Sequence, residues 1–556
     1  MDKSYAILYA GDIRTYLNQN NMPNYMILNN KLAIVYMDEN YEDIAISRIP
    51  GISYYSRGEE MSSLIDITNR LDIGITPMDA AGVSYIQQNP YITSSGRDIL
   101  IAIIDSGIDY LHPDFIQEDG TSKIVSIWDQ SSNKKNPPNG LLFGSEFTRE
   151  DINRAIAEND NTLTRDEIGT GTIAAGICSG RGEIKFSYSG IANNSELVVV
   201  KLREYDGRYK EGIKHYVDTD FFAAIRYVLD VAKREGKKII INLTVAARST
   251  SQILTTYLET FDEINTSGVI LVSGSGNEGN TDIHYQGFFK NQNYEDVKIQ
   301  VGEQNALRIT ISSIGPDKIG GAIISPSGEL SFRSTYAPDN FVYNGRFNLE
   351  NSTYRMRLIY PWIFSGNEEL MIDIDDIKPG IWTLRLYPEF TITKEFDVYL
   401  PNKRLMSINT RIIYQSAFST ITRYANVESV ITVGCYDTKT DGVWVGSSKG
   451  SFRETDRKPD IVAPGVDIIS TFINQSYTTA TGTGVSSSVV CGALGIIMEY
   501  LATQGPYEES TLFTQVLKTY LMLGADKKPI YTYPNESEGY GTMNLENTIK
   551  AIANLL

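Results

Sequence analysis

Asp105 is the clearest candidate for chemistry in this sequence, because it ends the apolar run Ile101–Ile104 and is followed by a glycine turn and then by His112-Pro113-Asp114. A carboxylate at the end of a buried strand lies at the edge of an open α/β sheet where active sites collect. Alone this is a weak signal, since many strands end in aspartate. It gains weight only beside other segments of the chain.

Those other segments are rich in glycine and small residues. Residues 169–177 read Gly-Thr-Gly-Thr-Ile-Ala-Ala-Gly-Ile, which is typical of a helix packed tightly at its N-terminus. Residues 482–488 read Gly-Thr-Gly-Val-Ser-Ser-Ser and lead into a second small-residue helix, with Lys-Pro-Asp-Ile-Val-Ala-Pro-Gly upstream at 458–465. Residues 272–279 read Val-Ser-Gly-Ser-Gly-Asn-Glu-Gly and contain Asn277.

In order and context these segments resemble the Asp, His and Ser boxes and the oxyanion-hole segment of the subtilisin-like serine proteases (subtilases). The resemblance covers about residues 67–284 and 425–556. It implies that Asp105 is the triad aspartate and that Asn277 is the oxyanion-hole amide. The family boxes read Gly-His-Gly-Thr and Gly-Thr-Ser-Met, whereas this chain has Thr170 at the histidine position and Gly484 at the nucleophile position.

These two replacements remove the nucleophile and the general base that peptide hydrolysis by a serine protease requires. Glycine has no side chain to attack a carbonyl, and threonine does not take up a proton near neutral pH as imidazole does. In subtilisin, loss of the serine or histidine alone lowers turnover about a millionfold. We therefore predict a pseudoprotease with no functional catalytic residue, in which Asp105 and Asn277 have structural roles.

Other residues are poor substitutes for the missing groups. The chain has three histidines, and none falls in a triad box: His112 lies in a His-Pro-Asp turn, His215 precedes a helix, and His284 borders a β-rich region. Ser486, Ser487 and Ser488 follow the nucleophile position on a predicted helix, where a shift of two residues turns a side chain by about 200°. We expect none of them to act as nucleophile or base.

The elements around these residues predict an α/β fold of the subtilisin type, with a doubly wound parallel sheet at residues 67–284 and 426–556. Continuous apolar runs indicate strands buried on both faces, and helical patterns lie between them. The predicted strands are 99–104, 197–202, 239–243 and 269–272; the predicted helices are 220–235, 251–266 and 545–554.

Two further domains are predicted. Residues 1–66 form an α+β unit with strands at 5–9, 25–28 and 32–37, a helix at 41–49 and a polar connector running to residue 68; this unit resembles the subtilase prodomain. Residues 285–425 read as an inserted antiparallel jelly roll, with strands at 297–301, 307–311, 371–374, 381–386 and 396–400.

Subtilase prodomains are removed by self-cleavage, which an inactive site cannot perform. We therefore predict that residues 1–66 stay attached, keep the mass near 62.0 kDa and occupy the cleft. The segment 241–246 resembles the subtilase strand that pairs with an extended substrate peptide, with Thr244-Val245-Ala246 in place of the family's Ser-x-Gly. The resemblance makes it the expected partner of the prodomain tail, because an edge strand binds a peptide through its main chain.

Composition excludes several classes of function. Hydrophobic residues make up 42% and charged residues 21% of the chain, and the net charge of −18 without a basic stripe argues against nucleic acid. The three cysteines, Cys178, Cys435 and Cys491, are expected to be buried, and no cofactor or metal constellation stands out, although calcium bound by loop carbonyls leaves no motif. The N-terminus lacks a signal h-region, and the apolar runs at 99–104 and 485–498 are too short or too interrupted to span a membrane.

The short attached prodomain, the absence of a secretion signal and the β insertion together resemble the clostridial Csp germination subtilases, and in particular a member with degenerate His and Ser boxes. That resemblance implies a place in the dormant spore, sensing of bile-acid germinants, and control of a sibling Csp protease that processes a cortex-lytic prohydrolase. Two alternatives stay open. One is an active protease with an unrecognised nucleophile; the other is a glycan-binding scaffold using aromatic residues that are more often sandwich core, namely Tyr360, Trp362, Phe364, Trp382 and Tyr387.

Overall fold

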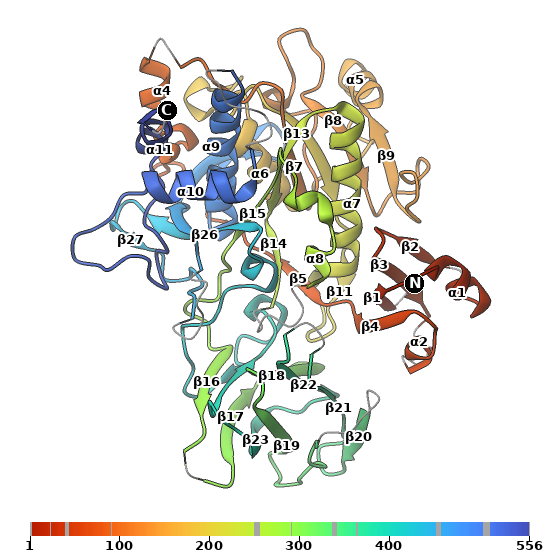
Figure 1. Ribbon diagram of the computed structural model, residues 1–556. Helices are drawn as coiled ribbons and strands as arrows, with labels where there is room; N and C mark the ends of the chain where they lie inside the picture. Colours follow the sequence, from red (N-terminus) through yellow and green to blue (C-terminus); the bar gives the residue numbers. More distant parts are fainter. Residues whose placement is uncertain are drawn as a thin grey trace.

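The computed structural model describes residues 3–22, 24–38, 44–89, 92–248, 256–290, 292–335, 342–362, 365–451, 458–503 and 512–554. Figure 1 shows a large central α/β unit, a small N-terminal unit at its side and an antiparallel β unit below it. The predicted fold class is confirmed.

The central sheet has the strand order β27-β26-β15-β13-β7-β10-β8-β9, with β28 paired to β26. Its inner strands are parallel, and the short outer strands β9 and β27 are antiparallel. The strands are β7 (Ile99–Asp105), β8 (Ile124–Asp129), β9 (Ser145–Thr148), β10 (Glu196–Lys201), β13 (Lys238–Leu243), β15 (Val269–Gly274), β26 (Val430–Asp437), β27 (Gly442–Val443) and β28 (Ile461–Pro464).

Strand β7 shows why the apolar runs form inner strands. Ile99, Ile101 and Ile103 pack into the core that contains α6 (Thr170–Ser179) and α9 (Thr483–Thr503). The alternate residues of β7 pack into a second core with α7 (Asp218–Glu235) and part of the N-terminal unit. A strand buried on both faces has no polar side to display, which explains the uninterrupted apolar sequence.

Shorter helices complete this unit: α3 (Pro77–Ala81), α4 (Ser84–Gln88), α5 (Arg149–Glu158), α8 (Thr256–Glu259), α10 (Thr514–Gly524) and α11 (Leu545–Asn554). The prediction of one helix over 251–266 is wrong in its described part, where α8 is followed by a separate 3-10 turn at Asp262–Asn265. Residues 251–255 lie outside the described residues. The predicted final helix is confirmed at Leu545–Asn554.

Helix α9 is, within the described residues, long and apolar enough to cross a membrane by length and composition, although residues 485–498 alone were predicted not to be. The apolar stretch extends beyond that run at both ends, and 89% of its most apolar window is buried inside the protein. Its environment is therefore that of a core helix. All three cysteines are also buried, as predicted.

The N-terminal unit is a four-stranded antiparallel sheet in the order β2-β3-β1-β4. It consists of β1 (Lys3–Tyr9), α1 (Ile13–Gln19), β2 (Tyr25–Ile27), β3 (Leu32–Met37), α2 (Ile44–Ser47) and β4 (Ile52–Arg57). The predicted connector is wrong for residues 52–57, which form β4. The sequence Ser53-Tyr54-Tyr55-Ser56 looks polar, but both tyrosine rings are buried and only their hydroxyl tips are polar. The described part of the predicted helix is only α2; residues 41–43 lie outside the described residues.

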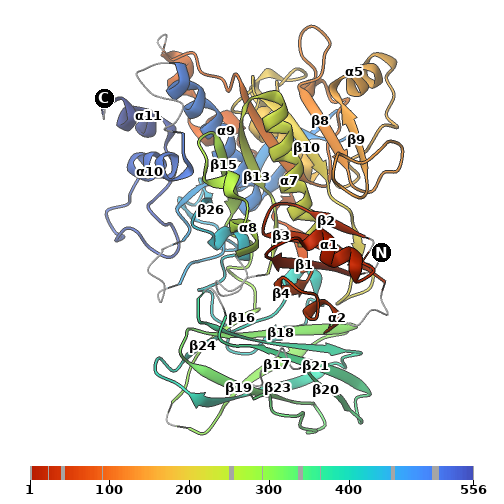
Figure 2. The same cartoon turned by 45° about the vertical axis from the view of Figure 1, so that its right-hand side comes forward.

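The antiparallel β unit is a sandwich of a six-stranded sheet, β16-β24-β18-β22-β21-β20, and a four-stranded sheet, β19-β23-β17-β25 (Figure 2). Its strands are β16 (His284–Phe288), β17 (Glu295–Val301), β18 (Ala306–Ser313), β19 (Lys318–Ile324), β20 (Val342–Phe347), β21 (Ser352–Ile359), β22 (Glu368–Asp375), β23 (Gly380–Phe390), β24 (Glu395–Tyr399) and β25 (Arg411–Ile412).

The aromatic residues considered for a glycan-binding face do not share one exposed surface. Trp382 is fully buried in the sandwich core. Trp362 is also buried and packs edge-on against Tyr54 of the N-terminal unit, with ring centroids 4.3 Å apart. Tyr360 and Tyr387 are half-buried, and Phe364 lies outside the described residues.

Candidate functional site

Asp105 lies at the end of β7, is fully buried and accepts hydrogen bonds from three neighbours. Thr170 Oγ1 and the Ser106 amide donate to Oδ1 at 2.5 and 2.7 Å, and Thr244 Oγ1 donates to Oδ2. Burial raises the pKa of Asp105 to about 6, against the opposing effect of these hydrogen bonds. Thr170, the residue predicted at the histidine position, thus donates a hydrogen bond to this carboxylate.

The N-terminus of α6 packs closely against the turn that follows Asp105, as its small residues predicted. Thr170 Oγ1 lies 3.0 Å from Ser106 Oγ, and the Gly171 amide donates to the same hydroxyl at 3.0 Å. A Cβ on Gly171 would lie 2.1 Å from the Gly107 carbonyl oxygen, so a residue larger than glycine would push the helix away.

Asn277 and the backbone of Gly484 converge on one carbonyl group, that of Leu64 in the N-terminal tail. The Gly484 amide donates to the Leu64 oxygen at 3.1 Å and Asn277 Nδ2 donates at 3.0 Å. Two donors at such distances are the geometry of an oxyanion hole. A Cβ on Gly484 would lie 3.1 Å from the Leu64 carbonyl carbon, so a side chain at this predicted nucleophile position would face the Leu64–Ile65 peptide.

The tail that carries Leu64 lies in the cleft as an extended strand. Its strand β5 (Glu60–Ser63) pairs antiparallel with β12 (Lys214–Val217) on one side and with β14 (Val245–Ala247) on the other. The Leu64 amide then donates to the Thr244 carbonyl at 2.8 Å. Strand β12 also pairs with the short β11 (Tyr205–Asp206).

Beyond Leu64 the chain continues across the site. Its strand β6 (Asp66–Ile67) pairs with β30 (Ser476–Thr481), which in turn pairs with β29 (Ile468–Phe472). The polypeptide therefore occupies both sides of the position where a scissile bond would lie. No local pattern pointed to Leu64, because the stretch around it is short and mixed in polarity and pairs with strands that are distant in the sequence.

Asn277 is held in its orientation from the other side. Its Oδ1 accepts from the Thr483 amide at 3.0 Å and from Thr483 Oγ1 at 2.9 Å. The serines that follow Gly484 are buried and donate elsewhere: Ser486 to the Ala463 carbonyl at 2.9 Å, Ser487 to Asn242 Oδ1 at 2.8 Å, and Ser488 to the Gly484 carbonyl at 2.8 Å.

The three histidines lie in three different places. The ring of His112 is buried, with Nε2 3.2 Å from the Ser476 carbonyl oxygen, and its Nδ1 accepts from the Asp114 amide. His284 Nε2 lies 2.9 Å from Asp397 Oδ1 in the sandwich. His215 lies on β12 and lines a pocket beside the tail. Within the described part of the chain, no group of three or more His, Cys, Asp or Glu side chains is placed to hold a metal ion.

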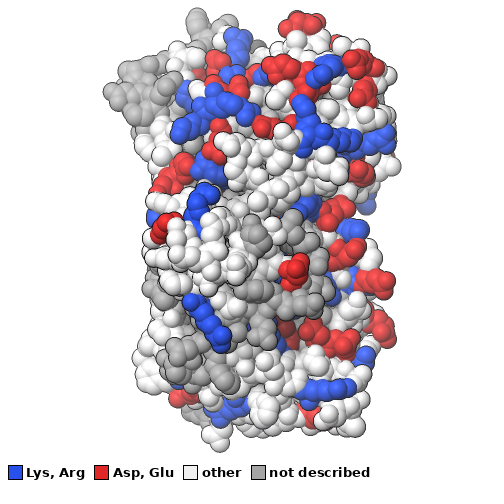
Figure 3. Space-filling view, turned by 90° about the vertical axis from the view of Figure 1, so that its right-hand side faces the viewer, with Lys and Arg blue, Asp and Glu red and all other residues white. Residues whose placement is uncertain are grey.

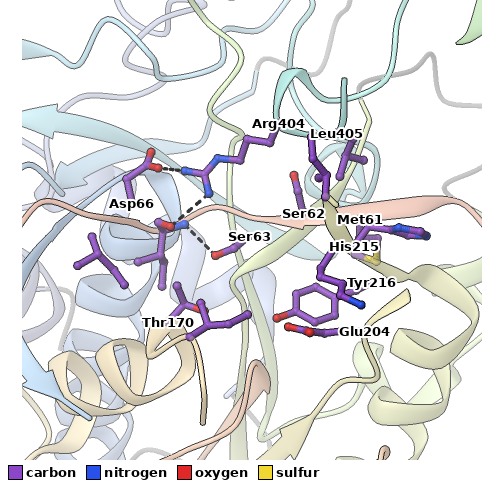
Figure 4. A pocket seen from close by; sticks show the side chains of 15 residues that line it. Met61, Ser62, Ser63, Asp66, Thr170, Glu204, His215, Tyr216, Arg404 and Leu405 are labelled. Atoms are coloured by element: carbon purple, nitrogen blue, oxygen red, sulfur yellow. Dashed lines mark hydrogen bonds and ion pairs between the residues drawn. The ribbon is translucent and has the colours of Figure 1, made fainter. Parts of the chain in front are cut away.

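That pocket has a volume of about 320 Å³ and is bordered by the tail itself (Figure 4). Its wall is mainly apolar, and Thr170 also lines it. Arg404 supplies a positive charge there, forms an ion pair with Asp66 and lies 3.4 Å from the Ile65 carbonyl oxygen. The apolar part of the wall consists of Met61, Ile65, Ile67, Ile168, Ile213, Tyr216 and Leu405.

Glu59, just before β5, is the ionic anchor of the tail. It is 3% exposed and lies 3.1 Å from Arg248, 2.8 Å from Arg308 and 3.9 Å from Arg423. Burial alone would raise the pKa of Glu59, but these guanidinium groups hold it well below its ordinary value. Arg248 follows β14, Arg308 lies on β18 and Arg423 begins the 3-10 turn after the sandwich, so one carboxylate joins all three units.

Sequence comparison relates this chain to known proteins. A model of the subtilase family matches residues 96–358 and 409–541. The C5a peptidase of Streptococcus pyogenes serotype M1 is 23% identical over 455 residues, which are 77% of this chain but 36% of that protein. The chain thus spans about a third of the length of such relatives. The major intracellular serine protease of Bacillus subtilis is 33% identical over 105 residues, or 18% of this chain and 31% of that protein.

Structural comparison gives a broader match. The CspB protease of Clostridium perfringens has a TM-score of 0.75 and 25% sequence identity, over 86% of this chain and 98% of that one. Fervidolysin from Fervidobacterium pennivorans, a keratinolytic enzyme related to subtilisin, has a TM-score of 0.51 and 12% identity, over 99% of this chain and 61% of that one. The latter likeness concerns the fold alone.

Proposed function

The chain belongs to the subtilase family, and we propose that it is a pseudoprotease of that family, resembling the Csp pseudoprotease CspC, which acts by binding. The observation that supports this most is the occupied oxyanion position. The Leu64 carbonyl receives both donors, at 3.0 and 3.1 Å, while the residue facing its carbon is a glycine. A substrate-like peptide is held in place, and the hydroxyl that would attack it is absent.

The proposal includes an N-terminal unit that stays attached as a permanent occupant of the cleft. Intact-mass measurement of pure recombinant protein should give a value near 62.0 kDa. A fluorophosphonate probe should leave the protein unlabelled, with an active subtilase as positive control. Labelling, or a species cut after Leu64, would instead support the alternative of an active protease with an unrecognised nucleophile.

We further propose a role in spore germination, in which the protein responds to a bile-acid germinant and controls a sibling Csp protease that activates a cortex-lytic prohydrolase. The structural similarity to a Csp protease supports a place in that system. The pocket beside the tail is the binding site we favour, because apolar walls suit a steroid body and Arg404 suits an acidic group.

Calorimetry of the full-length protein with a bile acid tests this binding role. Ile168→Glu places a negative charge in the pocket wall and should abolish binding of an acidic amphipath. Ile184→Glu is the matched control, because Ile184 is 52% exposed and does not line the pocket. Absence of heat with the unaltered protein, or equal binding by the Ile168 variant, would count against this pocket while leaving the pseudoprotease proposal standing.

A further inference from the structure

A second pocket lies where the N-terminal unit meets the six-stranded sheet of the sandwich, two elements that Figure 2 shows side by side. Its volume is about 220 Å³. Residues from β1 and β4 form one wall, and residues from β18, β21 and β22 form the other. At about 30 Å³ per water, the space would hold about seven water molecules.

The strand register explains why charged side chains meet here. Arg308 on β18, Asp373 on β22 and Arg355 on β21 lie opposite one another in adjacent strands. Because side chains alternate between the faces of a sheet, these residues share one face and the intervening Ile309, Ile372 and Met356 fill the sandwich core. The N-terminal unit therefore rests on a charged surface.

Positive charge is in excess in this pocket. Its lining contains six basic residues and three acidic ones, in a chain whose net charge is −18. On the described part of the face drawn in Figure 3, which is the side of the N-terminal unit, basic and acidic side chains are interspersed. The basic residues are Lys3, Arg57, Arg208, Arg308, Arg355 and Arg357; the acidic ones are Glu59, Asp373 and Asp375.

Two of the three acidic groups are already engaged. Asp373 Oδ1 accepts from Arg308 Nε at 2.7 Å and from Arg208 Nη2 at 2.9 Å. Glu59 Oε1 accepts from Arg308 Nη1 at 2.8 Å. These contacts do not involve Arg357.

Arg357 has the clearest unpaired donors in this pocket. Its Nη1 lies 3.4 Å from the Tyr55 carbonyl oxygen, and its guanidinium carbon is 4.7 Å from the centre of the Tyr55 ring. Its Nε and Nη2 are buried and have no hydrogen-bond partner among the described residues. Arg208 Nη1 likewise has no hydrogen bond within that part of the chain, although it lies 3.5 Å from Glu60 Oε1 in an ion pair. The Nε–Nη2 edge carries two parallel N–H groups, the arrangement that grips two oxygens of one carboxylate or phosphate.

We propose that this junction pocket binds a small, multiply charged oxyanion, a polycarboxylate or a phosphate, through the free edge of Arg357 with Arg208 as a further donor. An unpaired buried donor costs stability, and an oxyanion supplies the missing acceptors. Because its walls come from two units, the ligand would bridge the N-terminal unit and the sandwich.

Isothermal calorimetry of the full-length protein, with citrate and inorganic phosphate titrated separately at constant ionic strength, tests the site. We expect saturable binding of at least one of them, and the two titrations identify the preferred anion. Arg357→Lys keeps the charge but loses the fork, and should weaken binding about tenfold or more. Arg346→Lys, an exposed arginine on the neighbouring strand β20, is the control and should bind as the unaltered protein does.

Two results would overturn the assignment: no saturable binding of either anion by the unaltered protein, or equal affinity in Arg357→Lys. Arg208→Lys provides a second variant if Arg357→Lys does not fold, and it too must weaken binding. Neither outcome bears on catalytic inactivity, which the probe and mass measurements address separately.

Discussion

Replacing Glu59 with glutamine should loosen the tail in the cleft more than any exposed charge change. The glutamine is isosteric but neutral, so it leaves Arg248, Arg308 and Arg423 buried around a group that no longer offsets their charge. Removing one partner of a buried ion pair costs about 3–5 kcal/mol. Because the carboxylate joins three units, we expect this cost to appear as local opening of the tail rather than as global unfolding.

The magnitude can be read at a single amide. The Leu64 amide donates to the Thr244 carbonyl at 2.8 Å, so it exchanges with solvent only when the tail leaves the cleft. A loss of about 3–5 kcal/mol raises the population of that open state about 100- to 4,000-fold, at 1.4 kcal/mol per decade. Native-state hydrogen exchange followed by mass spectrometry should show this acceleration in peptides covering residues 60–65.

A matched control variant separates the effect of losing a buried carboxylate from the effect of losing one negative charge. Glu118→Gln removes a carboxylate whose side chain is 93% exposed and which lies 3.4 Å from Arg181, so it should change exchange in the tail by less than about threefold. If Glu59→Gln left tail exchange within that same margin, the view of Glu59 as the ionic anchor would be wrong.

Three other perturbations have defined outcomes. The pKa of Asp105 is raised from 3.8 to about 6, so the folded state binds this proton more tightly than the unfolded state does. The free energy of unfolding should therefore fall by up to about 3 kcal/mol between pH 4 and 7. In Asp105→Asn, denaturation measured across that pH range should lack this part of the pH dependence. Gly484→Ala would place a Cβ 3.0 Å from the Leu64 Cβ, so hydrogen exchange in the tail should accelerate by the equivalent of about 1–3 kcal/mol. Gly442→Ala is the control, because its added Cβ would have its nearest neighbour at 3.9 Å, and it should leave exchange in the tail unchanged. Trp362→Ala removes the ring that packs on Tyr54 and should cost about 3–5 kcal/mol, measured by urea denaturation; a cost below about 1 kcal/mol would contradict that contact.

Local patterns predicted the central sheet well because its strands have a distinctive apolar sequence. The run from Ile99 to Ile104 is apolar on both faces, and its length and β-branched residues are typical of a buried strand. The positions of Asp105, Thr170 and Gly484 followed from ordered motifs, and the structure brings the first two together at 2.5 Å.

Features that depend on distant partners were not predictable in this way. Strand β4 was missed because tyrosines carry its buried face, and the break in the helix expected over 251–266 leaves no local signal. The surroundings of Glu59 come from residues 248, 308 and 423, which only the folded topology assembles. Ion pairs between residues far apart in the sequence leave no periodic pattern along the chain from which they could be predicted.

In the proposed uncleaved protein, the covalent link between tail and cleft has a consequence for competition. A ligand on the same polypeptide acts at an effective concentration of about millimolar or more, whatever the amount of protein present. Dilution therefore does not empty the cleft. A peptide added in trans takes the place of Leu64 only when the ratio of its concentration to its dissociation constant exceeds the same ratio for the tail. Access to this groove is therefore set by opening of the tail, and an external partner gains most by binding surfaces that the tail leaves free.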